Sequence, residues 1–576
     1  MAVYTFGALH IDPASNPAVL NTGTWDAQLV THALSRCPVD RFSAEAITSL
    51  QGKISKELIV FIDSHGIKNG NDWYLCRLTD CQYFFISLGR IDDVTLGKPF
   101  FTKYLADNTY LCTFIASDTA IHKYATQICP EKGPKALGAI PRLGIGDRHS
   151  VTLWPGIYSA MAKKHFAANA IQNSVRELFR LETLVNGEPA RENHLYSFGK
   201  IKEGHTGSTF EGLWTAGVIS ALSSPYKQLS YGADADHLQV KRGAEGTSRT
   251  KKYLDSSRYY TFYTIDVSDI LEYHALTTFP VDEVKTKVEA AIPDASFRNE
   301  LVAYHQKKSE TYPLSDEQIS RFLCKYWHAL NAMEELDAYL RSIKEGERYD
   351  LELSIDETPA DFDVFKAITS NEELQFLIHE ITRRKIAITH IAPNFGVEKG
   401  VDYRAPGGLP VLEKRVALQV AMAKENGFML DCHSGDDLSR ETRKTFGRAS
   451  KGHIHFKVSP YLQVLFAEAL EEVNPKDFGI WWNDTLAYAE ESAAQGSTIA
   501  IESLRLLTET DRRKPSARHL FFREYNFATV GKRDAQGNFV FRPMFYSQSA
   551  EFQARLDEKV EKFLTECAED LWDSVR

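Results

Sequence analysis

The sequence predicts an α/β protein built on a TIM-like (β/α)8 barrel, with a helical insertion and a small N-terminal α/β or α+β region. Three observations support this prediction. Short apolar runs recur along the chain, helical segments separate several of them, and most runs end in polar, often acidic, residues. Alternation of strands and helices favours a parallel sheet that is buried on both faces, and eight such units can close into a barrel.

The first part of the chain, residues 1–135, is the predicted N-terminal accessory region. Its short apolar runs, such as ELIVFID and QYFFISLGR, are separated by turn-rich stretches and are typical of strands. The segment ICPEKGPKALGAIP contains Pro and Gly and is the predicted linker to the barrel domain, residues 136–576.

Eight runs are the candidate barrel strands. In chain order they are ALGAIPRLGIGDR, QLSYGADADH, YYTFYTIDVSD, YDLELSIDET, IAITHIAPNFG, FMLDCHSG, HIHFKVSP and HLFFREYNFA. Between them, helices are predicted at residues 411–426, which Gly427 follows as a natural stop, and at residues 460–473, which open with a proline.

An insertion at about 280–346 separates the third run from the fourth and is expected to be helical. Ser315 and Gln318 have the spacing of a capping box, which marks the start of a helix. Apolar residues follow at helical spacing, and this stripe is expected to pack onto the barrel.

The composition is that of an ordinary globular protein. The chain has 576 residues, 43% of them hydrophobic and 25% charged, and a net charge of −10. It has no basic stripe or tail, so its charge pattern gives no support for binding to nucleic acid or membranes. The sequence has no signal-peptide pattern and no apolar stretch that could cross a bilayer, so we expect a cytoplasmic protein. Whether it is a monomer or a homo-oligomer stays open at this point. The eight cysteines have no CxxC spacing and are expected to be reduced thiols.

Polar residues lie where the predicted strands end. In a (β/α) barrel these positions converge on one mouth, which carries the catalytic groups. The residues are Asp147, Arg148, Asp234, Asp236, His237, Asp266, Asp269, Glu352, Asp356, Glu357, Asn394, His433, Ser434, His455 and Lys457. An aspartate before a helix is also an ordinary N-cap, which remains the alternative for Asp266, Asp269 and Asp356.

His237 and His433 are candidate metal ligands, because imidazole and carboxylate groups bind divalent ions. A structural, hydrogen-bonded histidine is the alternative for each. The H-x-H of His453 and His455 also occurs in amidohydrolase barrels, but their later His and Asp pattern is absent here. The motifs GxGxxG, GxxxxGK[ST] and GxSxG are absent too, so the sequence supports neither a nucleotide site nor a nucleophilic serine.

The motifs resemble those of the tagaturonate epimerase family, also described as tagatose or fructose 4-epimerases. In chain order they are RLGIGDR, QNSVRE, YGADADH, YTIDVSD, LSIDET, FGVEKGVDY, DCHSG and HFKVS, which together span roughly residues 137–500. GADADH followed by HSG is the most specific part. The resemblance implies interconversion of D-tagaturonate and D-fructuronate, or of tagatose and fructose, in hexuronate catabolism. It also implies a divalent metal cofactor, for which Zn, Mn, Ni and Co are candidates.

The resemblance implies roles for particular residues. Asp236 is expected to be the proton acceptor and Glu352 the proton donor, while His237 and His433 are expected to ligate the metal. A third ligand is expected at His455 or, failing that, at Glu398. The substrate carboxylate needs a cationic partner, for which Arg148, Arg176 and Lys457 are candidates. The further predicted substrate contacts are Asp147, Asp266, Asp356, Asn394 and Ser434.

Three chemical routes and two other functions remain open. The C–H bond on the carbon β to the ketone is not acidified, so retro-aldol cleavage, rotation and re-addition form one route. Direct proton transfer by the acid pair is another. Transient oxidation by a nicotinamide is the third, and the missing dinucleotide motif counts against it. A metal-dependent aldolase that releases the two fragments and a non-catalytic sugar-acid-binding protein are the alternative functions.

Overall fold

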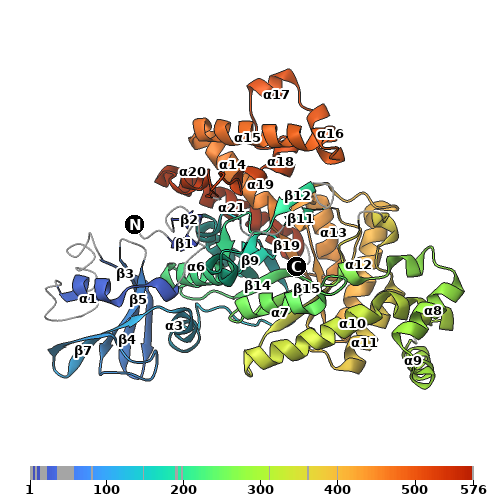
Figure 1. The fold of residues 1–576 in the computed structure, drawn as a ribbon, viewed down its shortest axis with the longest axis horizontal. Coiled ribbons are helices and arrows are strands. Elements are labelled where there is room, and N and C mark those ends of the chain that lie inside the picture. Colours follow the sequence, from blue (N-terminus) through green and yellow to red (C-terminus); the bar gives the residue numbers. More distant parts are fainter. Residues whose placement is uncertain are drawn as a thin grey trace.

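The computed structural model describes residues 4–6, 9–12, 22–35, 58–78, 82–146, 148–188, 192–195, 199–309, 312–359, 362–398, 400–536 and 538–573. Eight parallel strands form a closed barrel in the order β14-β15-β16-β17-β18-β19-β8-β9, and helices surround it (Figure 1). The strands are β8 (Arg142–Ile145), β9 (Ala167–Ser174), β14 (Tyr231–Gln239), β15 (Phe262–Asp266), β16 (Asp350–Ser354), β17 (His390–Ala392), β18 (Met429–Cys432) and β19 (His455–Val458). The predicted barrel is therefore confirmed.

One of the eight predicted strands is wrong. The run HLFFREYNFA forms two short helices, α18 (Leu520–Tyr525) and α19 (Phe527–Val530), and the missing strand is β9, whose sequence is AANAIQNS. Phe522 of α18 stacks against Trp482 of a neighbouring helix, so its apolar residues belong to a helix–helix contact. β9 has no apolar run in its sequence, because all of its residues except Ile171 are small or carry amides, although all except Ala167 are buried.

The centre of the barrel is polar. Phe262 lies in it, and its ring centre is 4.8 Å from that of His390 and 5.4 Å from that of His455. The guanidinium of Arg142 lies 5.4 Å from the same ring and pairs with Asp350 at 3.1 Å. These residues come from five different strands of the barrel. Side chains from strands around the barrel meet only in its interior, so these side chains lie in the lumen. Branched apolar residues usually fill such barrels, and the polar groups here must instead be paired.

The helices predicted around the barrel are present. α12 (Gly408–Glu425) ends just before Gly427, which has a φ of 82°, and α14 (Pro460–Val473) opens with its proline. Outside the insertion, the other α-helices between the barrel strands are α4 (Trp154–Lys164), α5 (Leu181–Val185), α6 (Phe210–Ser223), α7 (Gly246–Ser256), α11 (Asn371–Arg384) and α13 (Arg440–Ser450). Short strands β10 (Leu178–Phe179), β11 (Glu192–Leu195), β12 (Gly199–Lys202) and β13 (Ser208–Thr209) follow β9.

Three α-helices occupy the chain between β15 and β16, and the first two lie on the opposite side of the barrel from the N-terminal sheet (Figure 1). They are α8 (Val281–Ala291), α9 (Ala295–Lys308) and α10 (Asp316–Lys344). The capping box of Ser315 and Gln318 is formed at the start of α10. The apolar stripe of α10, which includes Ile319 and Phe322, is buried as the periodicity predicts.

An antiparallel five-stranded sheet lies before the barrel, in the order β3-β4-β5-β7-β6. The elements of this part are β1 (Tyr4–Phe6), β2 (Leu9–Ile11), α1 (Ala27–Ser35), β3 (Leu58–Lys68), β4 (Asn71–Leu78), β5 (Tyr83–Gly89), β6 (Phe101–Ala106), β7 (Thr109–Ile115) and α3 (Asp118–Lys123). Lys132 joins the sheet to the barrel, because its Nζ donates to the backbone oxygens of Asp63 in β3 and of Leu222 and Ser224 at the end of α6.

Helices complete the chain after α14. They are α15 (Pro475–Ala494), α16 (Thr498–Arg505), α17 (Glu509–Arg513), α18, α19, α20 (Arg542–Tyr546) and α21 (Ala550–Trp572). α21 packs against α4, where a Cβ on Gly156 would lie 2.9 Å from Val560. Among the described residues, six cysteines are free and buried, while Cys37 and Cys81 lie outside the described residues. No described helix combines the length and the apolar character needed to span a bilayer.

Candidate active site

Asp236 and His237 lie in β14 where its pairing with β15 is irregular. The register shifts between Ala235 and Leu238, so the two residues between them have no partner in β15. His237 has a φ of 50°, a conformation that residues with side chains rarely adopt. Such bulges redirect side chains and are common beside active sites. The irregularity presents both side chains at the mouth of the barrel.

Lys457 of β19 is the centre of a charged cluster. Its Nζ donates to Asp236 Oδ1 at 2.9 Å and to the Thr264 hydroxyl at 2.7 Å. It also lies 3.2 Å from Glu352 Oε2 and 3.4 Å from Asp234 Oδ2. Burial alone would lower the pKa of Lys457, but these carboxylates raise it well above its ordinary value. Lys457 therefore remains an ammonium ion that connects three strands across the barrel.

The carboxyl groups around Lys457 differ in their pKa values. Burial raises the pKa of Asp236, but Lys457 and the neighbouring imidazoles lower it to about 2. Glu352 is shifted in the same direction, well below its ordinary pKa, because Lys457 and His433 outweigh its burial. For Asp234, burial dominates over Lys457 and raises the pKa to about 7. The two predicted catalytic groups are thus carboxylates at neutral pH, while Asp234 is the member that holds a proton most readily.

His433 follows β18 and contacts two carboxylates. Its Nε2 lies 2.9 Å from Glu352 Oε1, and its Nδ1 lies 3.0 Å from Asp356 Oδ2. Its ring centre is 4.9 Å from that of His237. Burial would lower the pKa of His433, but Asp356 and Glu352 raise it to about 10. Ser434, next in the chain, has a left-handed backbone with a φ of 57°.

His237, Asp266 and Glu357 form a group that can hold a metal ion. Each offers one ligand atom, and these atoms lie within 4.8 Å of one another. His237 Nδ1 lies 3.7 Å from Asp266 Oδ2 and has no hydrogen-bond partner among the described residues. One imidazole and two carboxylates form a donor set that divalent ions accept. The residues of this mouth group therefore fit the predicted cofactor.

His455 lies apart from the mouth group. It is the first residue of β19, and its Nδ1 is 2.7 Å from Asp431 Oδ2. With His390 and Asp431 it forms a second group of potential metal ligands, all of them buried. The structure therefore brings His237 and His433 together and places His455 in a separate cluster, which we call the inner group.

The two arginines predicted to bind a carboxylate are already paired within the protein. Arg148 Nε donates to Glu177 Oε1 at 2.7 Å, and Arg148 Nη1 donates to Gln463 at 3.1 Å. Arg176 Nη2 donates to Glu357 Oε1 at 3.1 Å. Arg176 therefore links the mouth group to the loop after β9.

The other predicted residues occupy different positions. Asn394 Nδ2 donates to the backbone oxygen of Asp356 at 2.9 Å, which fixes the loops after β16 and β17 beside each other. Glu398 accepts two hydrogen bonds from Arg404, at 2.6 and 2.8 Å, and its ion pair lies outside both groups of potential ligands. Asp147 lies outside the described residues.

Thr264, His390 and Asp431 were not assigned to the site from the sequence. For two of them, the sequence contains an indication, because residues two positions apart in a strand lie on the same face. Thr264 precedes Asp266 by two residues and Asp431 precedes His433 by two, so each lies on the same face of its strand as a residue that was assigned. His390 had no such neighbour with an assigned role.

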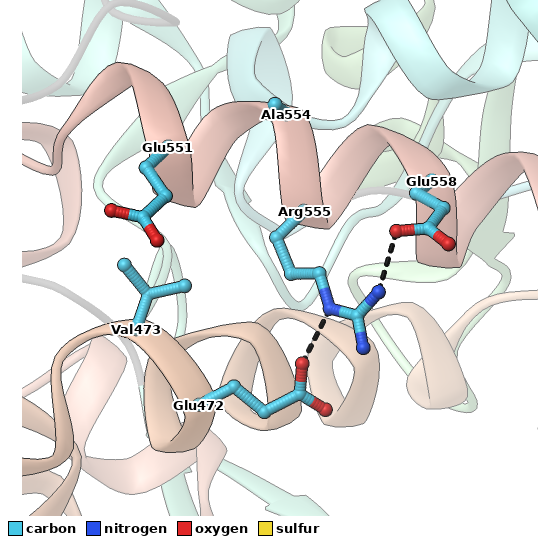
Figure 2. A pocket seen from close by; sticks show the side chains of 6 residues that line it. All are labelled: Glu472, Val473, Glu551, Ala554, Arg555 and Glu558. Atoms are coloured by element: carbon cyan, nitrogen blue, oxygen red, sulfur yellow. Dashed lines mark hydrogen bonds and ion pairs between the residues drawn. The ribbon is translucent and has the colours of Figure 1, made fainter.

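A surface groove shares no residue with this site. It is formed between α14 and α21 and is lined by Glu472, Val473, Glu551, Ala554, Arg555 and Glu558. Arg555 spans the groove and pairs with Glu472 and Glu558 (Figure 2). Its cation is thus occupied by carboxylates of the groove itself.

Comparison with known proteins agrees with this geometry. Residues 201–567 match the sequence profile of the tagaturonate epimerase family. Similar folds occur in crystal structures of fructuronate-tagaturonate epimerase UxaE from Cohnella laeviribosi. Its complex with one glycerol is 20% identical, with a TM-score of 0.65 over 92% of this chain and 99% of that chain. Its native form is 21% identical, with a TM-score of 0.64 over 91% and 99%. No curated protein matches the sequence.

The matched segment covers more than half of the chain and contains six of the eight barrel strands, β14 to β19. It includes Asp236, Glu352, His433 and Lys457, which meet at one end of the barrel. The chain therefore belongs to the tagaturonate epimerase family and is an epimerase.

Proposed function

We propose that this enzyme interconverts D-tagaturonate and D-fructuronate at the mouth of the barrel. The observation that carries the proposal is the cluster around Lys457, in which one ammonium ion lies 2.9 Å from Asp236 and 3.2 Å from Glu352. A proton acceptor and a proton donor are thereby held beside one buried cation, as acid–base catalysis by two groups requires.

We propose that a divalent metal ion binds at the mouth group of His237, Asp266 and Glu357, with His433 beside it. When bound, such an ion supplies Lewis-acid polarisation of the substrate ketone and stabilises the negative charge that develops on its oxygen. His433, which lies between Glu352 and Asp356, would join these ligands only as a neutral imidazole, the form that binds metal.

Asp236 begins the proposed reaction as a base. It takes the proton from the hydroxyl group on the carbon β to the ketone. The bond between that carbon and its neighbour then breaks, and the electron pair enters an enediolate while the β carbon becomes an aldehyde. Rotation of the aldehyde followed by re-addition forms the same bond on the other face, and the new alkoxide takes a proton back.

Glu352 returns a proton in this scheme. It is a carboxylate before substrate binds, because Lys457 and His433 lower its pKa, so it must first receive the proton that it gives. Lys457 contacts both carboxylates and provides the route between them. We propose Arg148 and Arg176, which follow β8 and β9, as partners of the substrate carboxylate, since each guanidinium has N–H donors beyond those that Glu177, Gln463 and Glu357 accept.

The test is removal and restoration of the metal. The full-length protein is treated with a chelator, reloaded with Zn, Mn, Ni or Co ions one at a time, and assayed by NMR with tagaturonate and, separately, with tagatose. We expect activity to disappear and return, with fructuronate as the product from tagaturonate. Full activity after complete metal removal would refute the metal assignment. Accumulation of three-carbon fragments in place of the epimer would favour an aldolase.

A further inference from the structure

The inner group of His390, Asp431 and His455 lies deep in the barrel and takes no part in the proposed reaction. Each of its side chains is completely buried. Their potential ligand atoms lie within 4.8 Å of one another, as do those of the mouth group. The two imidazole rings are nearly perpendicular, with centres 5.6 Å apart, and Phe262 packs against both. Three groups that can bind a cation are therefore held in fixed positions at one place.

The hydrogen bonds of the inner group leave ligand atoms without partners. His390 Nδ1 lies 2.7 Å from the Thr389 hydroxyl, which also donates to a backbone oxygen, so the ring donates from Nδ1 and Nε2 is left with a lone pair. Within the described part of the chain, His390 Nε2 and His455 Nε2 have no hydrogen-bond partner. A buried polar atom without a partner is costly, and native proteins rarely leave two together.

Two cations, Arg142 and Lys457, lie close to the inner group. Their charges are offset by the carboxyl groups of Asp234, Asp236, Asp350 and Glu352, with which they pair. A neutral imidazole ring and a deprotonated carboxylate are the forms of these side chains that bind metal.

We propose that the inner group binds a divalent transition-metal ion of its own, ligated by one ring nitrogen from each of His390 and His455 and by the carboxylate of Asp431. Two imidazoles and one carboxylate are a donor set suited to zinc or cobalt and less suited to magnesium or calcium, which prefer oxygen ligands. The ion lies beneath Glu352 and stabilises the polar centre of the barrel. A full complement is therefore two ions per chain, one at each group.

The test counts metal ions in the intact protein. The chelated chain is reloaded with cobalt or zinc, dialysed and measured by mass spectrometry for metal content. Cobalt also reports its coordination geometry through its visible absorption. We expect two ions per chain in the unmodified protein, one in His237→Gln, and one in His390→Gln and in Asp431→Asn. His453→Gln is the matched control, because it changes a histidine two residues before His455 and should keep both ions.

Each outcome decides the proposal. One ion in the unmodified protein, or two ions retained in both His390→Gln and Asp431→Asn, would overturn it and leave a buried water molecule as the occupant of the inner group. The His237→Gln protein gives a second readout, because it retains only the inner site and its thermal midpoint should rise with added zinc. The inner metal site and the proposed epimerase reaction can be refuted independently. An unmodified protein that binds two ions but does not convert tagaturonate would contradict the proposed reaction and leave the inner metal site standing.

Discussion

Lys457 shows how one residue organises a polar barrel. A buried carboxylate is costly unless it is paired, and this ammonium ion lies within 3.4 Å of oxygens from three different carboxyl groups, those of Asp234, Asp236 and Glu352. It therefore sets which of them are charged at neutral pH. The two groups with lowered pKa values are the two that the family resemblance identified as acid and base.

Replacement of Asp236 by asparagine tests the assigned base. The amide keeps the size of the side chain and can still accept a hydrogen bond from Lys457, but it cannot take a proton. We expect turnover to fall by roughly 100- to 10,000-fold, the usual contribution of a general base, while thermal stability and metal content change little. NMR rates with tagaturonate and metal analysis of the same sample provide the measurement.

The matched control is Asp234→Asn, two residues earlier on the same strand and beside the same ammonium ion. The pKa of Asp234 is raised to about 7, so this carboxyl already spends much of its time protonated and neutral. Its replacement should cost far less activity than that of Asp236. Equal losses in the two variants would show that the cluster needs total charge and that Asp236 has no specific role as a base.

At the level of elements, β18 continues into a short helical turn, Gly435–Asp437, that contacts the start of α14. Asp436 lies in this turn, and its Oδ2 accepts a hydrogen bond from the backbone nitrogen of Tyr461 at 2.7 Å. Burial, with a contribution from Asp437, raises the pKa of Asp436 from 3.8 to about 7. The folded protein therefore holds a proton here that the unfolded chain releases at a lower pH.

This shift predicts how stability depends on pH. Because the folded protein binds the extra proton, the stabilising effect is complete below about pH 4 and is lost as the pH rises through about 7. In Asp436→Asn the amide stays neutral and can still accept from Tyr461, so its thermal midpoint should fall less between pH 5 and pH 8 than that of the unmodified protein. Asp269→Asn, at an exposed position, is the control and should keep the original slope.

The elements differ in how well the sequence predicts them. Seven barrel strands are recognisable because an apolar run leads into a polar end, and α10 is recognisable from its capping box and apolar stripe. β9 has neither signal. These residues suit a strand because of what surrounds them: α4 and α6 cover one face of β9, where Ile171 contacts Gly217, and the polar centre of the barrel lies on its other face. The sequence of β9 alone therefore does not identify it as a strand.

The sequence predicts which residues belong to the candidate site better than it predicts how far along the barrel axis each one lies. Strand ends identify Asp236, His237, Glu352 and His433, and the structure brings these four together. His455 has the same residue type and a similar local pattern, yet it begins its strand, whereas Glu352 is in the middle of β16 and His433 follows the end of β18. Position along the barrel axis depends on strand register, which residue type does not encode.

For the whole molecule, the junction between the N-terminal sheet and the barrel depends on Lys132. Its side chain is 4% exposed, and its ammonium donates to two carbonyls at the C-terminal end of α6 and to one in β3. A cation at that end of a helix also interacts favourably with the helix dipole. Figure 1 shows the sheet beside α6.

Replacement of Lys132 by methionine should therefore weaken the junction without touching the reaction. The methionine fills similar space but leaves buried carbonyls without a donor, which costs roughly 1–3 kcal/mol. We expect a lower thermal midpoint and an unchanged kcat, measured on the same preparation. Lys227→Met, at an exposed position near α6, should change neither quantity. An unaltered midpoint in Lys132→Met would mean that the sheet is held by its apolar contacts alone.

The pairing of β8 with both β9 and β19 has a consequence for how the protein is made. During synthesis, β8 leaves the ribosome long before β19, and α21, which covers α4, comes later still. Until then the nascent sheet has an open edge at β8, and the lysine that neutralises the carboxylates of β14 and β16 has not yet been translated. The barrel cannot close until β19 and α21 have been synthesised. We therefore expect folding to be slow and to benefit from chaperones that shield unpaired strands.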